Sequence, residues 1–321
     1  MESFPGRLKA VPNRDPDVVV IGSGPNGLVA AATLAKKGFR VLVLEANPRR
    51  PGGALGSEEA TEPGFLHDVG AAFFPFAKAS PAFRFLEIGR HVEWRHARYE
   101  SCHPAPDGSV ACIARDPDEN ARAFGSEKDG AAWRRVAAWH RGIETRFLDL
   151  LLGPFPSLAP VLALGPVNLV RMARIFATSG RSLSERWFRT DAARRVLPGL
   201  ALHADAGPDD RFSAALGYVL GVMATTGGFP VPVGGARRLA NALVHVLEAH
   251  GGRIRLGARA TRIVVSGGRA AAVRLEGGDE IPASRAILAD TGAPSLFLDL
   301  MERKDVPARA VRRMGDRKSV V

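Results

Sequence analysis

The sequence predicts an α/β fold, and three consecutive elements near its start carry that prediction. The run VVVI at 18–21 is short, β-branched and followed by glycine, as expected of a strand buried on both faces. Residues 25–37 are predicted to form a helix, with proline in the first turn and Gly38 as the stop. The run RVLVLE at 40–45 is a second buried strand, which closes one βαβ unit with a right-handed crossover.

The loop between this strand and helix carries a phosphate-binding pattern. In GSGPNG, Gly22, Gly24 and Gly27 form a G-x-G-x-x-G arrangement. Gly22 permits the tight turn, Gly24 lets the backbone approach a pyrophosphate, and Gly27 allows close contact between helix and strand. The helix N-terminus offers unpaired N–H groups and a positive dipole end to an anion. Because strand, helix and glycines all fall where a dinucleotide needs them, the sequence predicts a Rossmann-type domain.

The acid that ends the second predicted strand narrows the choice of nucleotide. Glu45 lies about twenty residues beyond the glycines, where a carboxylate can accept hydrogen bonds from ribose hydroxyls. A 2′-phosphate about 4 Å from it would be repelled by about 4 kcal/mol at an effective dielectric of about 20. NADP is therefore disfavoured, whereas NAD and FAD both fit, since both carry free ribose hydroxyls.

A second glycine pair follows the acid in RPGGALGS. A simple NAD dehydrogenase has no stereochemical need for it, whereas a flavin dinucleotide bends back over the sheet. Arg50 can hold a phosphate through its fork of donors, and Gly52 and Gly53 keep the backbone low enough for an isoalloxazine to pass. The pair favours FAD over NAD. The simpler alternative is that Gly52 and Gly53 form only a surface turn.

The rest of the chain divides into a helical middle and a strand-rich end. Residues 80–115 mix short strand-like pieces with turns, and 117–226 are predicted to be mainly helical. A helix in ARRLANALVHVLEAHGG precedes five strand-like pieces, RIRLG, ATRIVVSGG, AAAVRLEGG, EIPAS and RAILAD. The expected domains are a discontinuous FAD-binding domain at 1–75 and 229–292, and an inserted, incomplete α+β substrate domain at 76–228 and 293–321.

One uncharged stretch, 150–170, is long enough to cross a bilayer. Four prolines would interrupt a spanning helix, so we reject that interpretation. Buried helical packing is the simpler explanation. The alternative is that this stretch forms a substrate entrance that contacts a membrane surface, from which a lipophilic substrate is taken up.

The composition of the chain argues against nucleic-acid binding and against a metal site. The formal net charge is +11, but the arginines are scattered among acids without aromatic-interleaved basic runs, so a solvated surface is favoured over nucleic-acid binding. The eight histidines lack ligand spacing and no Cys-x-x-Cys occurs, so no metal site is expected. Cys102 and Cys112 flank a predicted hairpin turn at Asp107-Gly108. With no apolar leader in the opening residues, we expect reduced thiols and a cytoplasmic protein.

The two glycine segments together resemble the start of a known family. VVVIGSGPNGLVAAATLAKKGFRVLVLEANPRRPGGALGSEEATEPGFLHDVGAAFFP is similar to the N-terminus of phytoene desaturase-related FAD-dependent oxidoreductases, which include carotenoid desaturases and isomerases. GGFPVPVGGARRLANALVHVLEAHGGRIRLGARATRIVV resembles the family's Pro-x-Gly-Gly helix and adenine-side strands, and the resemblance continues through RAILADTGAP. Together these segments cover most of the chain apart from the helical middle.

The resemblance implies FAD as cofactor and a role for each matching residue. Ala260 stands where the family often has valine, whose backbone meets the adenine. Gly234 and Gly235 would form the Pro-x-Gly-Gly turn near the flavin, with a purely structural turn as an equal alternative. Ala54 replaces an arginine that usually follows the second glycine pair, so one phosphate donor is expected to be missing. The implied cofactor-binding residues are Gly22, Gly24, Gly27, Glu45, Arg50, Gly52, Gly53 and Ala260.

Family members are longer, and a late glycine-rich segment closes over their flavin. Nothing after Ala293 resembles that segment, so a C-terminally truncated chain is expected.

The expected function is oxidoreduction of a lipophilic substrate, with a polyene or isoprenoid as the leading class. Hydride passes to the flavin as a double bond forms, with saturation and isomerisation left open. No catalytic side chain is assigned: His67 is expected to be structural, and Trp133, Trp139 and Phe147 to pack in a core rather than line a pocket. Peripheral membrane contact stays open. The alternatives are a non-catalytic nucleotide-binding fragment and, with less support, an NAD-dependent dehydrogenase.

Overall fold

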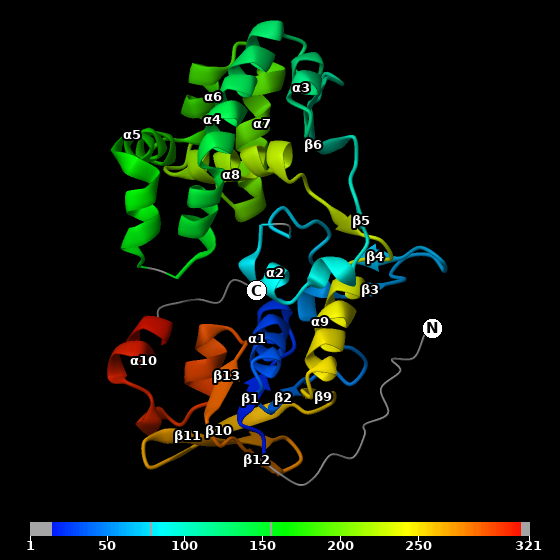
Figure 1. The fold of residues 1–321 in the computed structure, drawn as a ribbon, viewed down its shortest axis with the longest axis vertical. Helices are drawn as coiled ribbons and strands as arrows, with labels where there is room; N and C mark the ends of the chain where they lie inside the picture. The colour runs from blue at the N-terminus through cyan, green and yellow to red at the C-terminus, as the bar shows by residue number, and fades with distance from the viewer. Residues whose placement is uncertain (1–14, 78, 155, 316–321) are drawn as a thin grey trace. The chain divides into compact units, whose positions relative to one another are not determined.

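Two compact units make up the structure, a computed structural model that describes residues 15–77, 79–154 and 156–315 (Figure 1). The first unit contains the described residues within Met1–Ala72, Arg84–Glu93 and Pro232–Val321, and the second contains those within Phe73–Phe83 and Trp94–Val231. The opening residues 1–14, on which our expectation about a leader rests, lie outside the described part of the chain.

This division differs from the expected domains by three residues at two boundaries, 73–75 and 229–231, and by two longer segments. Residues 84–93 and 293–315 belong to the first unit, although the sequence assigned them to the substrate domain. The later segment is held there by packing: Leu300 is buried in the same apolar cluster as Val19, and its carbonyl accepts a 2.7 Å hydrogen bond from the Ile263 N–H. What each unit does remains a prediction.

A parallel sheet organises the first unit. Its strand order is β13-β1-β2-β9, and each neighbouring pair is parallel. The strands are β1 (Val18–Ile21), β2 (Val41–Leu44), β9 (Arg253–Arg255) and β13 (Ala286–Ala289). All four residues of β1 are buried, as its unbroken β-branched run predicts. The predicted βαβ unit is confirmed, with α1 (Pro25–Lys36) as its crossover.

Both faces of this sheet are covered. An antiparallel sheet of β10 (Ala260–Ser266), β11 (Arg269–Leu275) and β12 (Glu280–Pro282) packs on one face, where Val19 and Ile21 share a buried cluster with Val273. Because side chains alternate along a strand, Val18 and Val20 point to the other face. There α1 lies beside α9 (Arg237–Ala249), as Figure 1 shows. The shorter elements of this unit are β3 (Ser57–Glu58), β4 (His67–Asp68) and α10 (Ala308–Gly315).

The second unit is mainly helical, as predicted. Its helices are α3 (Pro117–Ala123), α4 (Glu127–Leu152), α5 (Leu158–Phe176), α6 (Gly180–Trp187), α7 (Asp191–Ala201) and α8 (Ser213–Thr226). Trp133 and Phe147 are buried in its core, which confirms the packing expected of them. Trp139 is only partly buried; its indole N–H donates to Asn168 Oδ1 at 2.9 Å. The strands β5 (Trp94–Arg95) and β8 (Val231–Pro232) and the helix α2 (Pro81–Phe85) lie at or near the points where the chain passes between units.

The predicted hairpin in this unit forms from β6 (Tyr99–Pro104) and β7 (Val110–Ala114). Cys102 and Cys112 are directly opposed in the register, with their sulfurs 2.7 Å apart as free thiols. Burial and the neighbouring Cys102 raise the pKa of the Cys112 thiol to about 12. A thiol held in this protonated form is a poor nucleophile at neutral pH.

Buried packing is the wrong explanation for much of the uncharged stretch. Helix α5 is the one described helix whose length and mean hydropathy of 1.3 would allow it to cross a membrane, yet only 17% of it is buried. Its backbone is non-helical at Gly165, just before Pro166, so the helix is broken into two segments. This break agrees with our rejection of a continuous span.

A buried histidine gives the helical unit a pH-sensitive stability. The His140 ring is fully buried, and its Nδ1 lies 3.0 Å from the Tyr218 hydroxyl. Burial lowers the pKa of His140 from 6.5 to about 4, because the imidazolium loses its hydration. Since the unfolded chain binds the proton more tightly, stability is complete above pH 6.5 and falls as the pH drops towards 4.

We therefore expect acid to destabilise this unit through His140. Between pH 7 and pH 5 the wild type should lose about 2 kcal/mol more unfolding free energy than H140Q, whose side chain does not titrate. Denaturant unfolding followed by tryptophan fluorescence measures this directly, since Trp133, Trp139 and Trp187 all lie in this unit. Equal pH dependence in the two proteins would contradict the assignment.

Candidate dinucleotide-binding site

The first glycine loop joins β1 to α1 at the carboxyl end of the sheet. Gly22 has φ = +92°, a conformation that favours glycine, and its N–H donates to the Leu44 carbonyl at 2.8 Å. A Cβ on Gly27 would lie 2.5 Å from the Gly22 carbonyl oxygen. The tight turn and the close helix–strand contact expected of these two residues are therefore present.

Glu45 is tied to this loop. One of its carboxylate oxygens accepts hydrogen bonds from the backbone N–H and the hydroxyl of Ser23, the first at 2.9 Å. The other accepts the N–H of Asn47 at 2.7 Å. Ser23 is fully buried, so these bonds fix Glu45 at the end of β2. A carboxylate has about four lone-pair sites, which leaves acceptor capacity for ribose hydroxyls.

The second glycine turn lies against the first. The Gly52 N–H donates to the Ser23 carbonyl at 2.9 Å, and a Cβ on Gly53 would lie 3.3 Å from the Gly24 Cα. Both Gly52 and Gly53 have positive φ, at +106° and +52°. Arg50 donates to the Gly53 carbonyl at 3.2 Å, with its guanidinium folded over Gly56. The pair therefore packs on the loop that would meet a pyrophosphate.

Asp290 also lies at this site, although no motif in the sequence pointed to it. It follows β13, and its Oδ2 accepts the Gly27 N–H at 2.9 Å. A Cβ on Gly24 would lie 2.5 Å from the same oxygen. The signal that could have found it is an acid at the end of a predicted strand, in RAILAD, but the sequence does not say which strand lies beside β1.

The remaining predicted residues lie near these loops or support them. Ala260 begins β10, and Ala258 just before it donates its N–H to the Glu45 carbonyl at 2.8 Å. Gly235 has φ = +85°, and the carboxylate of Asp68 next to it accepts the Ala236 N–H at 2.8 Å near the start of α9. The exposed His67 lies 2.8 Å from the Thr61 hydroxyl through its Nε2, a contact that fits a structural side chain.

These residues can accommodate a dinucleotide. The glycines carry no side chains of their own at the loop, Glu45 offers acceptors, and Arg50 carries a positive charge beside the second turn. At the start of α1, Pro25 has no N–H and the Gly27 N–H is bonded to Asp290, so Asn26 supplies the remaining donor among the first three helical residues. Among the described residues, no group of three or more His, Cys, Asp or Glu side chains could hold a metal ion.

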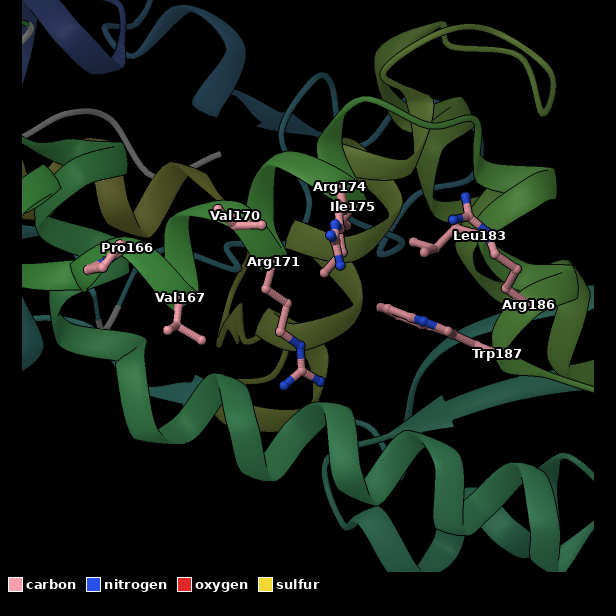
Figure 2. A pocket seen from close by; sticks show the side chains of 9 residues that line it. All are labelled: Pro166, Val167, Val170, Arg171, Arg174, Ile175, Leu183, Arg186 and Trp187. Atoms are coloured by element: carbon pink, nitrogen blue, oxygen red, sulfur yellow. The ribbon is translucent and has the colours of Figure 1, made fainter.

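The helical unit has a separate apolar hollow. Its volume is about 640 Å³, and Figure 2 shows the side chains of α5 and α6 that surround it. Three arginines border the apolar lining: Arg171, Arg174 and Arg186. The Arg171 guanidinium also lies over the Trp139 ring, 4.0 Å from its centroid.

Comparisons with known proteins agree with this geometry. Residues 20–88 match the model of the NAD(P)-binding Rossmann-like domain. The chain is 31% identical over 294 residues to hydroxyneurosporene desaturase of Rhodobacter capsulatus, covering 86% of this chain and 57% of that protein. It is 27% identical to the zeta-carotene-forming phytoene desaturase of Myxococcus xanthus, covering 89% and 55%. An oxidoreductase from Methanosarcina mazei has the same fold, with a TM-score of 0.60, 18% identity, and 93% and 65% coverage.

The fold and the family match define a Rossmann-like dinucleotide-binding domain. The chain is a relative of carotenoid desaturases, the family that its motifs resemble. The chain spans a little more than half the length of these two desaturases.

The contact between Gly27 and Gly22 predicts a specific intolerance. We expect G27A to lower the unfolding free energy by about 1–3 kcal/mol, because its Cβ would meet a backbone oxygen that cannot move aside. G277A is the matched control, since no atom lies within 4 Å of its added Cβ and that unit also contains it. Scanning calorimetry compares the two, and equal stability would contradict the packing described.

Proposed function

We propose that this protein is an FAD-dependent oxidoreductase acting on a lipophilic substrate of the polyene or isoprenoid class. The observation that carries the proposal is the contact between the two glycine turns, with Gly52 bonded to Ser23 and Gly53 packed on Gly24. One turn suits any dinucleotide, whereas the second lies where the flavin half would continue. The relatedness to desaturases supports the substrate class.

The chain's own residues would bind and orient the cofactor. Glu45 would accept the ribose hydroxyls, the N–H groups at the first glycine loop would meet the pyrophosphate, and Arg50 would supply positive charge at the second turn. Ala260 would place its backbone near the adenine, on the Glu45 side of the sheet. Bound flavin supplies the hydride acceptor, so the protein needs orientation and water exclusion rather than a nucleophile.

We also propose that α5 meets a membrane surface, from which a lipophilic substrate would come. Four large apolar side chains of α5 are more than half exposed: Leu158, Leu162, Val167 and Val170. Arg171 and Arg174 lie in the second half of the same helix, and Arg186 lies across the hollow. Apolar side chains beside arginines suit an anionic phospholipid surface, where both acyl chains and headgroups are matched. The protein would then work in the cytoplasm, at a membrane.

Two experiments test the cofactor part of this proposal: the visible absorption spectrum of the purified protein and the affinity of the variant E45Q for FAD. The purified protein should show flavin absorption near one equivalent, directly or after reconstitution with FAD. E45Q should bind FAD about tenfold more weakly, since a charged acceptor is lost while Ser23 keeps a partner. The same variant should lose part of the wild type's preference for ADP over 2′,5′-ADP, because the repelling carboxylate is gone.

Isothermal titration and flavin fluorescence measure these affinities. A colourless protein that FAD cannot reconstitute would favour the non-catalytic fragment. Bound flavin that only NADH reduces would revive the dehydrogenase alternative.

The membrane part is tested by charging α5. The double variant L162D/V167D should reduce association with phosphatidylglycerol vesicles at least about tenfold, because two exposed apolar side chains become charged. V110D/L202D is the matched control, since it charges two exposed apolar residues of the same unit outside α5. Co-flotation measures the bound fraction, and an equal loss in both variants would count against α5 as the contact.

A further inference from the structure

We infer that the Asp290 carboxylate acts as an electrostatic gate at the dinucleotide site, because its negative charge opposes binding of the cofactor's pyrophosphate. On binding, the pyrophosphate must either displace this carboxylate or lie beside it. The inference rests on the proposed FAD function and names the residue that sets its affinity. Three observations place Asp290 there: its position in the sheet, its bond to Gly27 and its contact with Gly24.

The topology puts Asp290 at the ligand-binding crevice. From β1 the chain moves to β2 on one side, while β13 lies on the other side of β1, so the strand order reverses between β1 and β13. In open α/β sheets, ligands bind at the carboxyl ends of the strands where this reversal occurs. Asp290 is the first residue after β13, and its N–H donates to the Ile21 carbonyl at 2.8 Å, at the very end of β1.

The Asp290 carboxylate lies where an anionic ligand would bind. Its Oδ2 accepts the Gly27 N–H at 2.9 Å, at the third residue of α1, where a phosphate oxygen would otherwise find a donor. The same oxygen lies where a Gly24 side chain would be. Asp290 has no ion-pair partner within 4 Å among the described residues.

Two consequences follow for this chain. Gly24 is required by Asp290 as well as by any ligand, because a Cβ there would meet the carboxylate. In the free protein, the Asp290 carboxylate already accepts a hydrogen bond at the N-terminus of α1. Dinucleotide binding would therefore replace one anion at this position with another. Like charges in one site oppose binding, and this opposition weakens as salt screens it.

The test is the affinity of D290N for FAD and for ADP. Asparagine keeps an oxygen acceptor for the Gly27 N–H but carries no charge, so the fold should be retained. We expect D290N to bind both ligands about tenfold more tightly than the wild type at low salt. The difference should shrink as the ionic strength rises to about 0.5 M, where the Debye length is only a few ångströms. D299N is the control, since it removes one exposed carboxylate of the same unit elsewhere.

The outcomes separate this inference from the proposed function. If the wild type binds FAD and ADP while D290N binds them equally or more weakly, Asp290 is only a cap for α1 and the gate is disproved. The same conclusion follows if D299N gains as much as D290N. If none of the three proteins binds either ligand, the proposed FAD function fails, and the gate fails with it.

Discussion

The hydrogen bonds of one buried serine determine the geometry of the dinucleotide site. Ser23 donates its N–H and hydroxyl to Glu45, and its carbonyl accepts the N–H of Gly52. Three segments that the sequence separates by up to 29 residues are thereby held at the carboxyl end of one sheet. Because Ser23 is fully buried, losing either partner would leave polar atoms unsatisfied away from water. The spacing between acid and glycines is therefore fixed before any ligand arrives.

Much of this unit could be predicted from the sequence, because the signals are local. The unbroken β-branched strand, the proline-started helix and the acid after the second strand each depend on a few neighbouring residues. The order of the strands could not be predicted, since β13 pairs with β1 across more than 260 residues. Asp290 was missed for this reason: its role depends on which strand lies beside it, and nothing in RAILAD specifies that.

The helical unit illustrates a different limit on what can be predicted from the sequence. An apolar helix can have the same composition whether it is exposed or buried. The sequence of α5 therefore favoured burial, although most of the helix is exposed. Burial depends on whether neighbouring helices cover a face, which is a property of packing rather than of the segment. The kink at Gly165 was foreseeable, by contrast, because Pro166 excludes a regular backbone before it.

We propose that the two acids of the site act in opposite senses on a dinucleotide, and this contrast follows from what each one contacts. Glu45 ends β2, where neutral ribose hydroxyls can donate to it, so its charge strengthens those hydrogen bonds. Asp290 ends β13 and takes the Gly27 N–H that a phosphate would use, so its charge opposes the ligand's. Similar carboxylates at the ends of the two strands that flank β1 would therefore favour the sugar and resist the phosphate. Affinity for a dinucleotide then depends on the balance between them, and that balance is adjustable at a single position, Asp290, without altering the serine-centred geometry on which the site is built.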